Sequence, residues 1–151
     1  MKKPAVGILF GGMSAEYPVS LESAYAVIKS VNTEKYEPVL IGLNQKGEWF
    51  HFVGPLEHIA NDTWCEPAFC TPAFISPCSQ TKGLVEVRGN EMSLVPPDAA
   101  FPVMHGPFGE EGTVQVLLEL AGIPIRGCGT LALAACMHKA MAPRVVGSLG
   151  V

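Results

Sequence analysis

The chain has 151 residues, of which 48% are hydrophobic and 16% are charged, so it suits one globular domain, or one domain with a short extension, and not a disordered protein. A net charge of −4 without a basic stripe argues against a nucleic-acid partner. No apolar run reaches the roughly 18 residues of a membrane span. The run Val6–Phe10 is also shorter than the minimum of about 7 residues for a signal-peptide core, so a cytoplasmic protein is expected.

The cysteine pattern argues against a zinc site and against a disulfide framework. The count is odd and no Cys-x-x-Cys spacing occurs. We therefore expect free and mostly buried thiols and no metal site. The five positions are Cys65, Cys70, Cys78, Cys128 and Cys136.

The first third of the chain alternates between strand and helix patterns. A short apolar run at Val6–Phe10 predicts a buried strand. A helix follows, with Pro18 in its first turn, where the missing N–H costs nothing. Val39–Leu43 and Glu48–Phe52 then predict a hairpin around the turn residues 44–47.

The remainder is more irregular until it returns to the same alternation. Residues 54–80 hold four prolines, so we expect a loop with one short helix near Leu56–Ala60. The elements expected after it are a hairpin of Leu84–Val87 and Met92–Val95, a strand Ala99–Met104, a helix Thr113–Ala121 ended by Gly122, a short strand Ile125–Arg126, and helices Thr130–Met137 and Lys139–Leu149. The pattern predicts an α/β fold, a Rossmann-like and mostly parallel sheet flanked by helices, with inserted hairpins.

Two glycine-rich junctions follow predicted strands and precede predicted helices. The first, Gly11–Glu16 (GGMSAE), fits neither a dinucleotide fingerprint nor a phosphate-binding P-loop. Its Glu16 is either a simple helix-start acid or a carboxylate that holds an ammonium group. The second begins at His105. Because parallel strands present their carboxyl ends at one edge, we expect Glu16 and His105 to face one cleft there.

These junctions carry a resemblance to the D-alanine:D-alanine ligases. Gly11–Glu16 with Val19–Leu21 (VSL) looks like that family's opening motif, and His105–Gln115 (HGPFGEEGTVQ) resembles its H-G-x-x-G-E-D-G-x-x-Q motif. Leu120–Pro124 (LAGIP), Gly127–Cys128 and Met137–Lys139 (MHK) continue the likeness in the same order. Within the family, Gly47–His51 and Asn61–Trp64 look most similar to the VanG-type D-alanine:D-serine ligases of vancomycin resistance.

The resemblance implies an ATP-grasp enzyme of peptidoglycan precursor synthesis, expected to be a homodimer without a nucleic-acid or membrane partner. ATP with Mg²⁺ would phosphorylate the first D-amino acid, and the amine of the second would attack the acyl phosphate. The site residues implied are Glu16 on the ammonium of the first D-alanine, Val19 and Ser20 on the neighbouring wall, His105 with Gly106 near the same substrate, and Lys139 on the nucleotide phosphates.

The resemblance also predicts a division of the chain. Residues 1–127 would form an N-terminal substrate domain, and residues 128–151 a helical linker toward an ATP-grasp domain that this sequence does not contain. This domain alone would bind no cofactor, and the isolated chain would be inactive.

Some positions depart from the family pattern, and they keep a rival interpretation open. Tyr17 and Pro18 replace charged or polar residues, and Glu111 replaces an aspartate. Gly129 and His138 stand where aspartate is common, and Arg144 replaces a lysine. The rival is a non-catalytic remnant that serves as a dimerisation or small-molecule-binding module. A third alternative, the N-terminal domain of another ATP-grasp enzyme, agrees less well with the two junction motifs.

Overall fold

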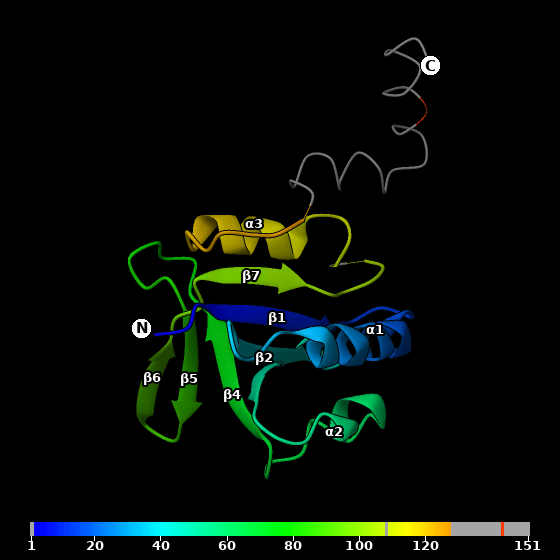
Figure 1. The fold of residues 1–151 in the computed structure, drawn as a ribbon. Helices are drawn as coiled ribbons and strands as arrows, with labels where there is room; N and C mark the ends of the chain where they lie inside the picture. The colour runs from blue at the N-terminus through cyan, green and yellow to red at the C-terminus, as the bar shows by residue number, and fades with distance from the viewer. Residues whose placement is uncertain (1, 108, 128–142, 144–151) are drawn as a thin grey trace.

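The computed structural model describes residues 2–107, 109–127 and 143 as an α/β fold (Figure 1). Seven strands in these residues form one sheet in the order β6-β5-β4-β3-β2-β1-β7. The strands are β1 (Ala5–Gly11), β2 (Glu37–Leu43), β3 (Trp49–Phe52), β4 (Cys70–Ile75), β5 (Leu84–Arg88), β6 (Glu91–Val95) and β7 (Ala99–Pro102). The helices are α1 (Tyr17–Ser30), α2 (Glu57–Ala60) and α3 (Thr113–Leu120).

The predicted parallel sheet exists, but it is only the centre of a larger mixed sheet. Strand β1 pairs in parallel with β2 on one side and with β7 on the other. The four remaining strand pairs, from β2–β3 through β5–β6, are antiparallel. The α/β class, the flanking helices and both hairpins are therefore confirmed, whereas the expectation of a mostly parallel sheet is wrong for the sheet as a whole.

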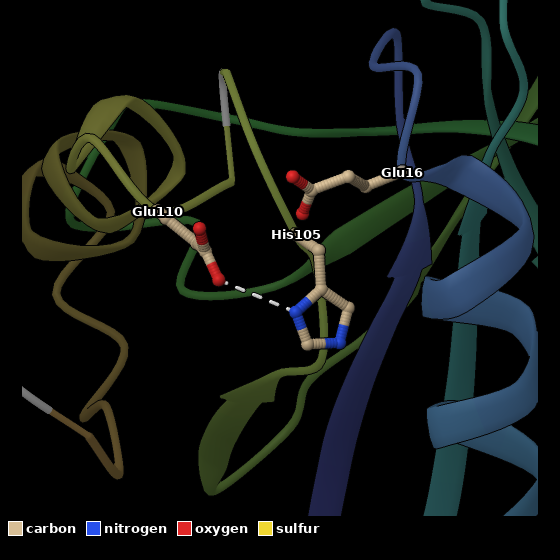
Figure 2. Close-up of side chains that lie close together, drawn as sticks. All are labelled: Glu16, His105 and Glu110. Atoms are coloured by element: carbon tan, nitrogen blue, oxygen red, sulfur yellow. Dashed lines mark hydrogen bonds and ion pairs between the residues drawn. The ribbon is translucent and has the colours of Figure 1, made fainter. Parts of the chain in front are cut away.

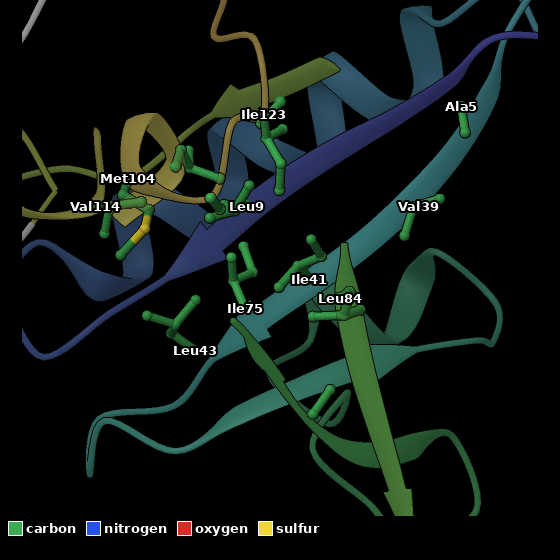
Figure 3. Packing of buried hydrophobic residues seen from close by; sticks show 14 residues of the cluster. Ala5, Leu9, Val39, Ile41, Leu43, Ile75, Leu84, Met104, Val114 and Ile123 are labelled. Atoms are coloured by element: carbon green, nitrogen blue, oxygen red, sulfur yellow. The ribbon is translucent and has the colours of Figure 1, made fainter. Parts of the chain in front are cut away.

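Helices cover both faces of the parallel centre, which explains the uninterrupted apolar runs of β1 and β2. On one face, Leu9 and Ile41 pack with Val114 and Leu118 of α3 (Figure 3). On the other, Ile8 and Phe10 pack with residues of α1 and α2. No helix that the structure describes is long and apolar enough to span a bilayer.

Strand β4 corrects the expectation of a loop over residues 54–80. Its first half pairs with β3 and its second half with β5, so it joins the central sheet to the β5–β6 hairpin. Pro72, which argued against a strand, pairs with Phe50 in the β3 half. The short helix predicted near Leu56–Ala60 is confirmed as α2.

The cysteines that the structure describes are free but not buried. Cys65 and Cys78 are exposed and Cys70 is half-buried, so the expectation of mostly buried thiols is wrong for these three. Cys128 and Cys136, the predicted helices after Thr130 and the linker 128–151 lie outside the described residues.

An aromatic cluster fills the face covered by α1 and α2. The Trp64 ring is completely buried and meets Phe10 edge to face, with ring centroids 5.0 Å apart. Gly42 on β2 lies directly beneath it. A Cβ atom at this position would be 2.2 Å from Trp64 Cζ3 and 2.9 Å from Phe10 Cζ. The glycine is therefore required by the close approach of the indole.

A buried carboxylate links β5 to β3 and β6. Glu86 accepts hydrogen bonds from His51 on β3, at 2.5 Å, and from Ser93 Oγ on β6, at 3.0 Å. Burial raises the pKa of Glu86, but the hydrogen bonds from His51 and Ser93 outweigh it and hold the pKa below its ordinary value. The ionised form is therefore favoured by the folded state.

We expect Gly42→Ala to destabilise the fold by about 1–3 kcal/mol, the usual cost of overpacking, because the methyl group must displace Trp64. Urea unfolding followed by tryptophan fluorescence measures this cost. Gly7→Ala is the matched control, since its Cβ would lie no closer than 3.4 Å to any neighbouring atom. Equal losses in the two variants would contradict the packing argument.

We expect Glu86→Gln to lower the free energy of unfolding at pH 7 by about 1.5–3 kcal/mol, the value of a hydrogen bond to a charged group. A carboxyl whose pKa is lower in the folded state stabilises the protein above the pKa of the unfolded chain, about 4.3. That contribution is lost as the pH falls through the folded-state pKa. Unfolding curves from pH 7 to pH 3 should therefore converge, and a constant gap would contradict this origin.

Candidate functional site

The two glycine-rich junctions meet at the carboxyl edge of the parallel strands. The first lies between β1 and α1 and holds Glu16, and the second follows β7 and begins near His105. Ser14 ties them together, because its hydroxyl donates to the His105 carbonyl at 2.7 Å and accepts from the Glu16 N–H at 3.1 Å. Ser14 thus connects two loops whose residues Glu16 and His105 lie 89 positions apart in the sequence.

A second hydroxyl, that of Ser20, also links the two junctions. Ser20 is completely buried, accepts a hydrogen bond from Gly11 N at 2.8 Å and donates to the Val103 carbonyl at 2.5 Å. It therefore holds the ends of β1 and β7 together through backbone atoms. The neighbouring Val19 is 48% exposed. The substrate-binding roles assigned to Ser20 and Val19 stay predictions.

Glu16, His105 and Glu110 form a compact group that we call the Glu-His-Glu cluster (Figure 2). One ligand atom from each residue lies within 4.8 Å of the others. His105 Nδ1 is 3.3 Å from Glu110 Oε1, and its Nε2 is 3.1 Å from Ser23 Oγ. The prediction that Glu16 and His105 come together at the carboxyl edge is confirmed.

Gly106 allows the close approach of the two loops. Its φ of +72° belongs to the left-handed region, which glycine adopts without steric cost. A Cβ atom there would lie 3.1 Å from Ser14 and 3.6 Å from the carboxyl carbon of Glu16. The residue therefore keeps space beside the Glu16 carboxylate, whereas contact with substrate stays a prediction.

Two members of this site, Glu110 and Ser23, were not among the predicted site residues. Ser23 follows Glu16 by seven positions, so helical periodicity places it on the same face of α1. Glu110 stands two residues before Gly112, whose left-handed conformation begins α3. Helical periodicity could therefore have identified Ser23 as a site residue, whereas no sequence pattern indicates where the side chain of a loop residue such as Glu110 points.

Gln115 holds the loop that carries Glu110. Its side chain is buried, and its Nε2 donates to the Gly109 carbonyl at 3.1 Å. Its Oε1 has no partner among the described residues, and Gln115 and Glu110 both line a cavity of about 140 Å³. The hydrogen bond from the buried Gln115 side chain thus fixes the backbone just before Glu110.

Tyr17, one of the departures from the family pattern, anchors the start of α1. Its hydroxyl donates to Asp62 Oδ1 at 2.6 Å and accepts from Trp64 Nε1 at 2.9 Å. Burial and the hydrogen bond to Asp62 raise the pKa of Tyr17 above its ordinary value. A neutral phenol therefore fixes the backbone directly beside Glu16.

The Glu-His-Glu cluster suits a cation. Its two carboxylates offer only acceptors, and the His105 ring contacts one of them, Glu110, through Nδ1 and contacts Ser23 Oγ through Nε2. A triphosphate needs N–H donors and positive charge, so this group does not fit here. Lys139, the residue predicted to contact nucleotide phosphates, lies outside the described residues.

Comparison with known proteins agrees with this architecture. The family model described as "D-ala D-ala ligase N-terminus" matches residues 5–128. A D-alanine--D-alanine ligase of Caldicellulosiruptor bescii is 43% identical over 145 residues, which cover 96% of this chain and 39% of that protein. The chain thus spans about two fifths of the length of this curated relative.

Solved structures give the same result. The VanG D-Ala:D-Ser ligase of Enterococcus faecalis superimposes with a TM-score of 0.93 at 40% identity, over 99% of this chain and 43% of that one. A D-alanine--D-alanine ligase of Bacillus anthracis, solved in complex with ATP, matches with a TM-score of 0.61 at 27% identity, over 98% of this chain and 37% of that one. The chain belongs to the family of D-alanine:D-alanine ligase N-terminal domains and corresponds to the N-terminal part of such a ligase.

Proposed function

We propose that this chain is the part of an ATP-dependent D-alanine ligase that binds the first D-amino acid. The observation that carries the proposal is the Glu-His-Glu cluster, because it gathers two carboxylates and an imidazole at the edge where two parallel strands end. A primary ammonium is a cation that only donates, which matches the two carboxylate acceptors in charge and in hydrogen bonding.

Each residue of the cluster has a separate part in this proposal. Glu16 and Glu110 accept charged hydrogen bonds from the ammonium, each contributing about 1.5–3 kcal/mol. Ser23 Oγ fixes the His105 ring through Nε2, and the ring holds the Glu110 carboxylate through Nδ1. Ser14 and Gly106 set the separation of the two loops, which keeps the acceptors in place before substrate arrives.

ATP and Mg²⁺ would bind elsewhere in the complete ligase, because the acceptors of the cluster repel phosphate oxygens. There they would supply the phosphoryl group that activates the carboxylate of the first D-amino acid. Lys139 is our candidate for contact with the nucleotide. The second substrate is D-alanine or D-serine, and the likeness to the VanG enzyme supports D-serine. We further propose a cytoplasmic homodimer, an inference that rests on the family resemblance alone.

In a complete ligase that contains this domain, we expect Glu16→Gln to lower kcat/KM for the first D-alanine by about one to two orders of magnitude. The substitution keeps the shape and removes a charged hydrogen bond of roughly 1.5–3 kcal/mol, at about 1.36 kcal/mol per decade. The KM for ATP should stay unchanged. Steady-state kinetics with each substrate varied separately measures both effects.

Glu22→Gln is the matched control for this experiment, since Glu22 is an exposed acid on α1, close in sequence to Glu16, and lies outside the cluster. It should leave both parameters at the wild-type value. A Glu16→Gln enzyme with a raised KM for ATP and normal use of D-alanine would place this acid on the nucleotide side and overturn the proposal.

We expect the 151 residues alone to form no D-alanyl dipeptide from ATP and D-alanine, because the cluster supplies acceptors for an ammonium and nothing that stabilises phosphoryl transfer. Phosphate release and dipeptide formation are the measurements. ATP-dependent release above the enzyme-free rate, abolished by Glu16→Gln, would contradict this expectation.

A further inference from the structure

We propose that the Glu-His-Glu cluster also binds a divalent transition-metal ion of the Zn²⁺ and Co²⁺ type, in competition with the ammonium. This inference uses the residues of the proposed function but can be tested without it. Its basis is the convergence of one imidazole nitrogen and two carboxylates within 4.8 Å.

The geometry is close to that of a three-ligand metal site. Around a tetrahedral ion with bonds of about 2.1 Å, the ligand atoms lie about 3.4 Å apart. The present separations therefore require a movement of about 1 Å, which the exposed Glu16 and the 40% exposed side chain of Glu110 can make. A fourth position stays open for water, as in zinc sites with three protein ligands.

The surroundings of His105 favour the same conclusion. Histidines that bind metals through one ring nitrogen almost always donate the other N–H to a fixed acceptor. Ser23 Oγ, which lies outside the cluster, is 3.1 Å from Nε2 and can be that acceptor. In the free chain Nδ1 donates to Glu110 Oε1 at 3.3 Å, so a metal ion that binds at Nδ1 displaces this proton to Nε2, which then donates to Ser23 Oγ.

A buried side chain fixes the loop that carries Glu110. Gln115 is 5% exposed, and its Oε1 has no hydrogen-bond partner among the described residues. It shares with Glu110 the cavity of about 140 Å³ described above. Its amide nitrogen keeps the loop in place through Gly109, which holds Glu110 beside His105 before an ion binds.

The ligand chemistry selects the type of ion. Mg²⁺ and Ca²⁺ prefer sites made of oxygen only, whereas an imidazole with carboxylates suits Zn²⁺, Co²⁺ and Ni²⁺. Both the metal ion and an ammonium need the carboxylates of Glu16 and Glu110, so binding of one excludes the other. Such an ion would therefore act as an inhibitor that competes with the first D-amino acid.

The test is titration of the purified chain with Co²⁺, followed by its visible absorption, and with Zn²⁺, followed by calorimetry. We expect His105→Asn and Glu110→Gln each to weaken binding at least tenfold, and Ser23→Ala to weaken it by about ten- to a hundredfold, as loss of an outer-shell partner does. Glu111→Gln is the matched control, since this neighbouring acid contacts Thr113 and is not in the cluster. It should bind like the wild type.

Two results would overturn the metal site. One is wild-type affinity in both His105→Asn and Glu110→Gln, and the other is a Co²⁺ spectrum with the charge-transfer band of thiolate ligands, which would assign the ion to the cysteines. Far-UV circular dichroism checks that each variant is folded, and Glu110→Gln changes only a half-exposed loop residue.

A competition experiment separates this inference from the proposed function. Saturating D-alanine should weaken Zn²⁺ binding to the wild type, whereas D-lactate, which has no ammonium group, should not. Metal binding that D-alanine does not weaken would support the metal site and contradict ammonium binding at the cluster. D-alanine binding without any metal binding would support the ammonium site and contradict the metal site.

Discussion

The site depends on the hydroxyl of Ser20. Completely buried on α1, it accepts from the backbone at the end of β1 and donates to the backbone just after β7. Each bond fixes the end of one strand relative to the helix that begins at Tyr17. Ser14 repeats this arrangement in the loop before α1, where it holds the backbone of Glu16 and of His105. These two serines therefore set the distance between the two loops together with the sheet and the contact of Ser23 with His105.

The parallel and antiparallel parts of the sheet contribute to the site in different ways. The parallel centre, β2-β1-β7, carries the loops whose side chains converge, and its strands are covered by helices on both faces. The antiparallel strands extend the sheet away from that edge. They contribute to the site indirectly, since Trp64, in the segment between α2 and β4, binds the hydroxyl of Tyr17 beside Glu16.

Much of this could be predicted from the sequence, because local patterns determined it. Val6–Phe10 is a buried run between Pro4 and Gly11, and its strand was found with its neighbours. The convergence of Glu16 and His105 followed from strand polarity alone. Strand β4 could not be found in the same way, because Pro72 argues against a strand and its pairing is decided by β3 and β5, which are distant in sequence. Glu110 was missed because the direction of a loop side chain depends on packing, here the contact of Gln115 with Gly109.

The contact between His51 and Glu86 has a mechanical consequence. The two residues come from β3 and β5, so their ion pair spans β4, the strand that changes partners halfway along its length. A strand divided in this way is a natural hinge, about which the β5–β6 hairpin could twist relative to the central sheet. The contact of His51 with Glu86 crosses this point and links the strands on either side of β4 directly to each other. The β5–β6 extension is thus fastened to the central sheet by a buried side-chain contact in addition to the backbone pairing of β4.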